Sequence, residues 1–220
     1  MNKWATATRL LVPLLAWVLF SGTSMAEPVL SAQPPVHPQQ VIQDVTDQLL
    51  VLLKDKKSQQ EQGELNEAQF LADLETILDP SIDYVKFSKG VMGKYYRKST
   101  DEQQQQFISV FKKSLFSAYA TAFLTLDGET ITIHPYTRPL KTKAIIKMDV
   151  YAANGTVYPI SYSMHLTKDN TWKVKNVIAG PLNLGLTFKN LFLDLMSKHR
   201  DIDLAIENWS SDVASPSTTT

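Results

Sequence analysis

Hydrophobic residues recur at every third or fourth position between Thr100 and Leu126, a spacing that predicts an amphipathic helix. Thr100 can cap the start of this helix, and Gln103 is placed to complete a capping box. From Ser114 onward the polar face narrows until the helix is apolar nearly all round. Such a helix must be buried on several sides. We therefore expect it to face a wide apolar surface, supplied either by the protein or by an apolar ligand.

The same period predicts shorter helices on both sides of this long one. Asn66 can cap the second of them, and the polar stretch 54–63 is expected to form a loop before it. A third short helix precedes Thr100, and two more close the chain. The expected ranges are 38–53, 66–78, 83–97, 186–196 and 202–209.

At Asp127–Gly128 the period changes from 3.6 to 2, which is typical of strands with one buried face. Ala153–Gly155 is a strong signal for a hairpin turn. Short turns between alternating segments predict an antiparallel meander of about four strands, apolar on one face and polar on the other. Helices before and after the sheet then predict an α+β domain whose helices cover one sheet face. The expected strands are 130–134, 144–151, 158–166 and 172–178.

The N-terminal segment has the pattern of a secretory signal peptide. Lys3 and Arg9 form a basic start, an apolar run follows at 10–20, and Ser24–Ala26 supplies the small residues of a cleavage site. A membrane anchor is the weaker interpretation, because the run is far shorter than the ~20 residues that span a bilayer. The expected organisation is a signal peptide at 1–26, a flexible tether at 27–37, a single domain at 38–209 and a disordered tail at 210–220.

The charge balance and the absence of cysteine narrow the function classes. The chain has 22 basic and 22 acidic residues, and loss of Lys3 and Arg9 with the leader leaves a mature net charge of −2. This balance argues against a nucleic-acid-binding protein, which normally carries a basic excess. Without cysteine there is neither a disulfide framework nor a lipoprotein attachment site. We expect a soluble exported protein, most simply a periplasmic one.

Candidate catalytic chemistry is sparse. The histidines His37, His134, His165 and His199 are scattered, and none has metal-ligand spacing with another. His165 falls on the polar face of its expected strand, where a solvated side chain is the simplest interpretation. No nucleophile elbow, Walker loop or dinucleotide fingerprint is present. The sequence therefore predicts no enzyme, no metal and no cofactor.

Apolar surface, by contrast, is in excess. The residues of the long helix, the inner strand rows and the penultimate helix can form either a filled core or a pocket for a variable apolar ligand, because methionine is flexible and tyrosine adds a polar rim. The apolar loop 181–186 is typical of a pocket mouth. Composition leaves both possibilities open. The candidate pocket residues are Phe87, Met92, Phe111, Leu115, Tyr119, Phe123, Ile146, Met148, Val150, Ile160, Tyr162, Met164, Ile178, Leu182, Phe188 and Phe192.

Three local patterns together resemble the MlaC, or toluene-tolerance, family of periplasmic phospholipid-binding proteins. They are Leu78–Pro80 followed by Phe87–Arg97, Ser99–Gln103 followed by Phe107, Phe111, Lys112, Tyr119 and Ala122, and Trp172–Val174 followed by Asn176–Ala179. With the leader they cover most of the mature chain. One departure is Gly180–Pro181, where the family commonly has Glu-Gly after the last strand.

The resemblance implies a twisted antiparallel sheet wrapped by helices around a pocket for phospholipid acyl chains. It also implies a carrier that exchanges lipid between an outer-membrane lipoprotein–porin complex and an inner-membrane ABC transporter with an MCE-domain protein, and so maintains outer-membrane lipid asymmetry. The alternative is a non-enzymatic periplasmic interaction module or chaperone with a filled core.

Overall fold

The computed structural model of the protein describes residues 36–124, 130–152 and 154–210, and at 118–124 it describes the backbone only. All of these residues belong to one of the two units into which the chain divides, Pro34–Thr220. The helices are α1 (Pro38–Glu61), α2 (Glu67–Leu78), α3 (Tyr84–Met92), α4 (Asp101–Leu124), α5 (Leu184–His199) and α6 (Ile202–Glu207), with 3₁₀ turns η1 (Asp79–Ser81) and η2 (Gly93–Tyr95). The strands are β1 (Thr130–Ile133), β2 (Lys143–Tyr151), β3 (Val157–Leu166), β4 (Trp172–Ala179) and β5 (Leu182–Asn183).

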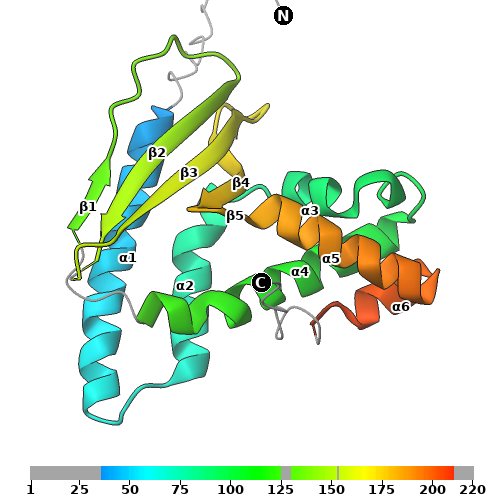
Figure 1. The fold of residues 1–220 in the computed structure, drawn as a ribbon, viewed down its shortest axis with the longest axis horizontal. Coiled ribbons are helices and arrows are strands. Elements are labelled where there is room, and N and C mark those ends of the chain that lie inside the picture. The colour runs from blue at the N-terminus through cyan, green and yellow to red at the C-terminus, as the bar shows by residue number, and fades with distance from the viewer. Residues whose placement is uncertain (1–35, 125–129, 153, 211–220) are drawn as a thin grey trace, which may run out of the picture. The chain divides into compact units, whose positions relative to one another are not determined.

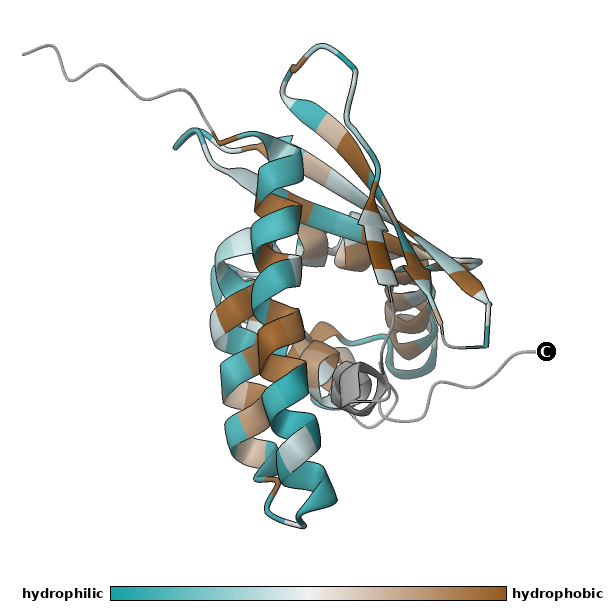
Figure 2. Cartoon of the chain, turned by 90° about the vertical axis from the view of Figure 1, so that its left-hand side faces the viewer, coloured by the Kyte–Doolittle hydropathy of each residue, from teal (hydrophilic) through white to brown (hydrophobic). Residues whose placement is uncertain are grey.

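The five strands form one antiparallel sheet in the order β1-β2-β3-β4-β5, so the predicted α+β fold with a meander is confirmed. On β2 the alternation is strict: Ala144, Ile146, Met148 and Val150 are buried. Helix α1 lies against this inner face, behind β2 in Figure 1, and Ile42 joins the buried cluster there. In Figure 2 apolar and polar positions alternate along α1 and along the strands.

Side-chain caps determine where several helices begin. The predicted capping box of α4 is present, because the Gln103 N–H donates to Thr100 Oγ1 at 3.2 Å and the Thr100 N–H donates to Gln103 Oε1 at 3.0 Å. Asn66 accepts from the Gln69 N–H at 3.0 Å at the start of α2. The prediction for α3 was too long: Gly93, with a φ of 56°, ends the α-helix at Met92.

The predicted loop at 54–63 is wrong, because α1 continues as helix to Glu61. The buried Lys56 explains this extension: its Nζ lies 3.0 Å from Asp73 Oδ2 of α2. Lys56, a charged residue that the sequence suggests would face water, therefore faces a neighbouring helix. The predicted apolar loop at 181–186 is also wrong, because Leu182–Asn183 pairs with β4 and Asn183 caps α5 from Leu184.

Besides the cluster around Ile42, the protein has an aromatic core that lies where α3, α4, α5 and α6 meet, as Figure 1 shows. Phe107 is fully buried, with ring centroids 5.0 Å from both Phe192 and Trp209. The edge-to-face geometry of these pairs is the arrangement that aromatic rings prefer. We call this group the aromatic cluster; it comprises Phe87, Phe107, Phe111, Phe188, Phe192 and Trp209.

Replacing Asp73 with asparagine is expected to lower the free energy of unfolding by about 1–3 kcal/mol at pH 7, because the buried Lys56 would lose its nearer counter-charge and keep only Asp55, 3.9 Å away. A hydrogen bond from Gln69, and then Lys56, hold the pKa of Asp73 below its ordinary value. A lowered pKa stabilises the fold above the unfolded value of about 3.9, and this stabilisation is lost as the pH falls through the lower folded value.

Urea unfolding of wild type and Asp73→Asn at neutral and acidic pH measures this effect. Asp47→Asn is the matched control, because Asp47 accepts a similar bond from Gln43 but has no lysine partner within ion-pair distance among the described residues. A difference between wild type and Asp73→Asn that stayed the same at the acidic end would contradict the assignment.

Candidate functional site

An apolar cavity of about 300 Å³ lies between α1 and the inner face of β3 and β4. Residues of α2, η1, α4 and the start of α5 close its sides. This volume is at the lower end of the ~300–1,000 Å³ that is common for ligand sites. The lining residues are Ile42, Val45, Thr46, Leu49, Leu78, Ser81, Ile82, Leu115, Phe116, Ile160, Tyr162, Val174, Val177 and Leu184.

The polar side chains in this wall offer little to a charged ligand. The Thr46 hydroxyl donates to the Ile42 carbonyl at 2.7 Å, and the Ser81 hydroxyl donates to the Leu78 carbonyl at 2.8 Å. Burial raises the pKa of Tyr162 to about 12, so its phenol is neutral at physiological pH. The structure shows no hydrogen-bond partner for the Tyr162 hydroxyl among the described residues. The cavity therefore suits an uncharged, apolar group.

An irregularity in the pairing of β3 and β4 places two β4 side chains on the same wall of the cavity. The register between β3 and β4 shifts between Ser163 and Met164. In a regular strand Val174 and Val177, three positions apart, would point to opposite faces. The shift allows both side chains to line the cavity.

Two polar arrangements hold the walls of the cavity in place. Lys112 of α4 lies 2.6 Å from both Glu75 Oε1 and Asp79 Oδ2, and its Nζ is 5.4 Å from the centroid of the Tyr84 ring. Partial burial lowers the pKa of Lys112, but hydrogen bonds to Asp79 and Glu75 outweigh this effect and raise it overall. These contacts tie α2, η1, α3 and α4 together beside the cavity residues Leu78 and Ile82.

The second arrangement fixes the start of α5. The Gly185 N–H donates to Asn176 Oδ1 at 2.8 Å, and Asn176 Nδ2 donates to Asn183 Oδ1 at 3.0 Å. A Cβ at position 185 would lie 2.5 Å from Asn176 Oδ1, so any other residue would displace the Asn176 side chain from these hydrogen bonds. Leu184 is thereby held against the cavity.

A more polar groove of about 310 Å³ adjoins the cavity and shares Val45 and Ser81 with it. The side chains of Asp44, Gln48 and Asn170 line this groove together with apolar residues of α1, α2 and the start of β4. An apolar chamber next to an open, partly polar groove is the arrangement that an amphiphilic ligand requires.

The predicted pocket residues fall into several groups. Leu115, Ile160 and Tyr162 line the cavity. Phe87, Met92, Phe111, Phe188 and Phe192 pack in the filled core around the aromatic cluster, Ile146 and Met164 pack with Ile42, and Met148 and Val150 are buried on the same sheet face. Ile178 pairs with Ser161, a position on the sheet face opposite the cavity. Leu182 is 38% exposed. The side chains of Tyr119 and Phe123 lie outside the described residues.

The contribution of α1 to the cavity was not predicted from the sequence. Its residues Ile42, Val45 and Leu49 lie at helical spacing and line the cavity, but they are not among the candidate pocket residues. A signal was available in the sequence, because apolar residues at helical spacing predict a buried face on α1. Val174 and Val177 gave no such signal, since the register shift that aligns them is not visible in the alternation of β4.

His165 is not solvated as predicted but is only 4% exposed. Its Nε2 lies 2.7 Å from Asp83 Oδ2, and its Nδ1 lies 3.0 Å from Lys86 Nζ. The start of α3 covers the histidine, because Asp83 caps that helix and its backbone N–H donates to the Val174 carbonyl.

Two properties hold for the part of the chain that the structure describes. Within it, no group of three or more histidine, cysteine or acidic residues is arranged to hold a metal ion. None of its helices has the length and apolar character that crossing a bilayer requires.

Comparison with known proteins agrees with the fold. The family model for MlaC protein matches residues 43–211. The toluene tolerance protein ttg2D of Pseudomonas putida is 37% identical over 179 residues, which are 80% of this chain and 81% of that protein. A phospholipid-binding protein from Ralstonia solanacearum, solved in complex with a phospholipid, superposes with a TM-score of 0.71 at 23% identity, over 81% of this chain and 98% of that one. The chain belongs to the MlaC family.

Proposed function

We propose that this protein is a periplasmic phospholipid carrier that buries acyl chain in the apolar cavity and leaves the headgroup in the adjoining groove. The observation that carries the proposal is that the apolar cavity and the more polar groove share the lining residues Val45 and Ser81, so the two spaces are neighbours. The family and the phospholipid in the Ralstonia neighbour support it.

The energetics of transport favour such a cavity. Burying a methylene is worth ~0.8 kcal/mol, so a chain of about 16 carbons costs on the order of 12 kcal/mol to expose to water. A carrier must therefore supply apolar surface for most of each chain it moves, whereas the charged headgroup can stay hydrated. No bond has to be made or broken, so the proposed function is not enzymatic.

We further propose that the leader at 1–26 directs export and that lipid passes between two membrane complexes. The outer-membrane partner is a lipoprotein–porin complex, and the inner-membrane partner is an ABC transporter with an MCE-domain protein. Such exchange maintains the lipid asymmetry of the outer membrane. These roles rest on membership of the MlaC family.

Purified protein is expected to carry intact phospholipid. Organic extraction followed by mass spectrometry identifies the lipid, and a phosphorus assay gives its ratio to protein. Protein refolded from denaturant without lipid is the control, and it should regain lipid from added vesicles. Lipid-free protein that cannot be loaded would instead favour an interaction module with a filled core. Fatty acid and lysophospholipid accumulating during incubation would contradict a non-enzymatic carrier.

A further inference from the structure

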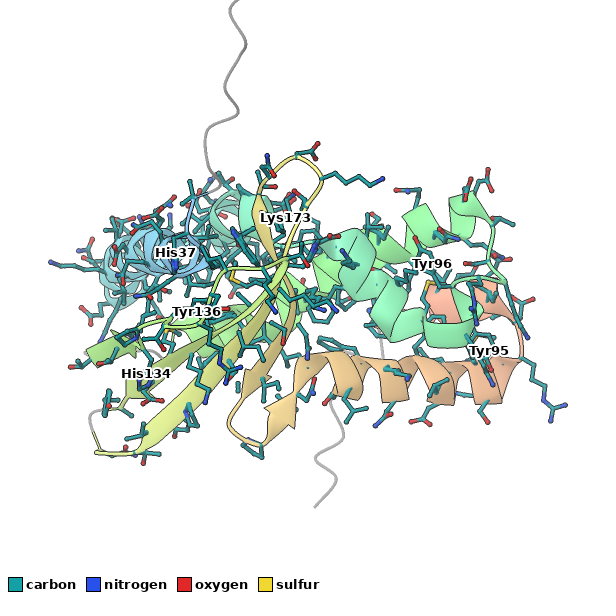
Figure 3. All side chains as sticks on the ribbon, turned by 90° about the horizontal axis from the view of Figure 1, so that it is seen from above. His37, Tyr95, Tyr96, His134, Tyr136 and Lys173 are labelled. Atoms are coloured by element: carbon teal, nitrogen blue, oxygen red, sulfur yellow. The ribbon has the colours of Figure 1, made fainter. Side chains whose placement is uncertain are left out.

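The outer face of the sheet, opposite the cavity, carries a concentration of basic side chains. On β2 the outward positions are those between the buried ones, and they read Lys143, Ile145, Lys147, Asp149 and Tyr151. Lys143 pairs with His165 of β3, which pairs with Lys173 of β4, so these three residues form a row across the sheet. Figure 3 shows His134 and Lys173 toward opposite ends of this face.

The positive charge on this face is largely uncompensated. The carboxylates of Asp149 and Asp83 reach it, but Asp149 lies 2.8 Å from His134 Nε2 and Asp83 lies 2.7 Å from His165 Nε2. Among the described residues, no carboxylate lies within ion-pair distance of Lys143, Lys147, Lys173 or Arg138. Lys143 and Lys147 lie on the same side of β2, two alternate outward positions apart, and their like charges repel each other. An anionic partner would remove that cost.

The basic side chains surround an open groove of about 430 Å³ on this face. Arg138, Lys143 and Lys147 line it with His134, Tyr136 and Ile145. The segment between β1 and β2 is anchored to α1, because the Tyr136 N–H donates to Gln39 Oε1 at 2.9 Å and its ring packs edge-on against His37 at 5.8 Å. Figure 3 shows Tyr136 between His37 and His134. The basic groove is therefore held in place by α1.

Apolar side chains are exposed among these charges. Ile145, between Lys143 and Lys147, is 53% exposed, and Leu140, between Arg138 and Lys141, is 47% exposed. Tyr151, at the end of the same outward row, is also exposed. Lysine and arginine mixed with aliphatic and aromatic residues is the composition that binds the interface of an anionic bilayer. An acidic protein would not by itself account for the apolar members.

We infer that the outer face around this groove binds the anionic surface of a phospholipid bilayer. This interaction is separate from the proposed carrier function, because the cavity uses Ile160 and Tyr162 on the inner face of the same strands. Near an anionic surface each basic residue strengthens binding roughly fivefold. The attraction between charges is screened by salt, whereas the apolar contribution is not.

Co-sedimentation with vesicles tests the inference. The protein is mixed with vesicles of equal parts phosphatidylglycerol and phosphatidylcholine, or of phosphatidylcholine alone, at low and high salt. Wild type should bind the anionic vesicles and lose most of this binding at high salt. Lys143→Glu/Lys147→Glu should weaken binding by more than about 25-fold. Ile145→Ser should weaken it less, and equally at both salt concentrations.

Lys54→Glu/Lys98→Glu is the matched control, since it makes the same change in net charge at exposed positions away from this face. It should bind vesicles like wild type, and all variants should retain the wild-type amount of extractable lipid. Equal binding by the two double variants would overturn the inference, as would equal binding to neutral vesicles. No binding of wild type to anionic vesicles would also overturn it and would leave an acidic protein surface as the partner.

Discussion

Replacing Val177 with tryptophan should remove most of the bound phospholipid without unfolding the protein. Val177 lines the cavity from β4 and pairs with Tyr162, another cavity residue. The indole ring would occupy space that an acyl chain needs. Excluding about six methylenes costs ~5 kcal/mol, which corresponds to more than a 1,000-fold loss of affinity. Phosphorus analysis of the purified variant measures the loss.

Val157→Trp is the control for this experiment. It makes the same substitution on β3 at a position that is 44% exposed and does not line the cavity. Lipid content should stay at the wild-type level, and thermal unfolding should show both variants to be folded. A folded Val177→Trp protein with full lipid content would show that the acyl chain is held elsewhere.

Phe192→Ala should have the opposite profile, with a large loss of stability and little change in lipid content. Phe192 is fully buried in the aromatic cluster, with its ring centroid 5.0 Å from Phe107 and 6.2 Å from Trp209. Removing a buried phenylalanine costs about 3–5 kcal/mol, because apolar burial is lost and a void remains. Denaturant unfolding should show this loss, and the melting temperature should fall by about 10 °C or more.

Phe192→Leu is the control, since it keeps most of the apolar volume and should cost about 1–2 kcal/mol. Both variants should retain extractable phospholipid under native conditions, because Phe192 does not line the cavity. If Phe192→Ala were stable but lipid-free, the aromatic cluster would belong to the binding site, as the sequence predicts for its members Phe87, Phe111, Phe188 and Phe192.

Local signals in the sequence were sufficient for most of the fold. The capping box at Thr100 and Gln103 and the alternation on β2 are decided by neighbours a few residues away, and both predictions are confirmed. The prediction of a loop at 54–63 was wrong because Lys56 pairs with Asp73, which lies on another helix. The prediction of a solvated His165 was wrong for the same reason, since its partners Asp83 and Lys86 lie at the start of α3.

The candidate site was harder to predict than the fold. Whether an apolar residue fills a core or lines a cavity depends on the distance to the facing element, and no periodicity encodes that distance. Phe111 and Leu115 lie one helical turn apart on α4, yet Phe111 packs in the aromatic cluster and Leu115 lines the cavity. The shifted register at Ser163 and Met164 likewise results from how two strands pair.

The internal hydrogen bonds of Thr46 and Ser81 have a consequence for ligand selectivity. Both hydroxyl protons are already donated to backbone carbonyls of the same chain segment, so neither is directed at a guest molecule. A wall of this kind distinguishes guests by volume, and one methylene more or less is worth only about 1–3 kcal/mol in an apolar site. The cavity is therefore suited to a mixed membrane population, accepting tails of differing length and unsaturation.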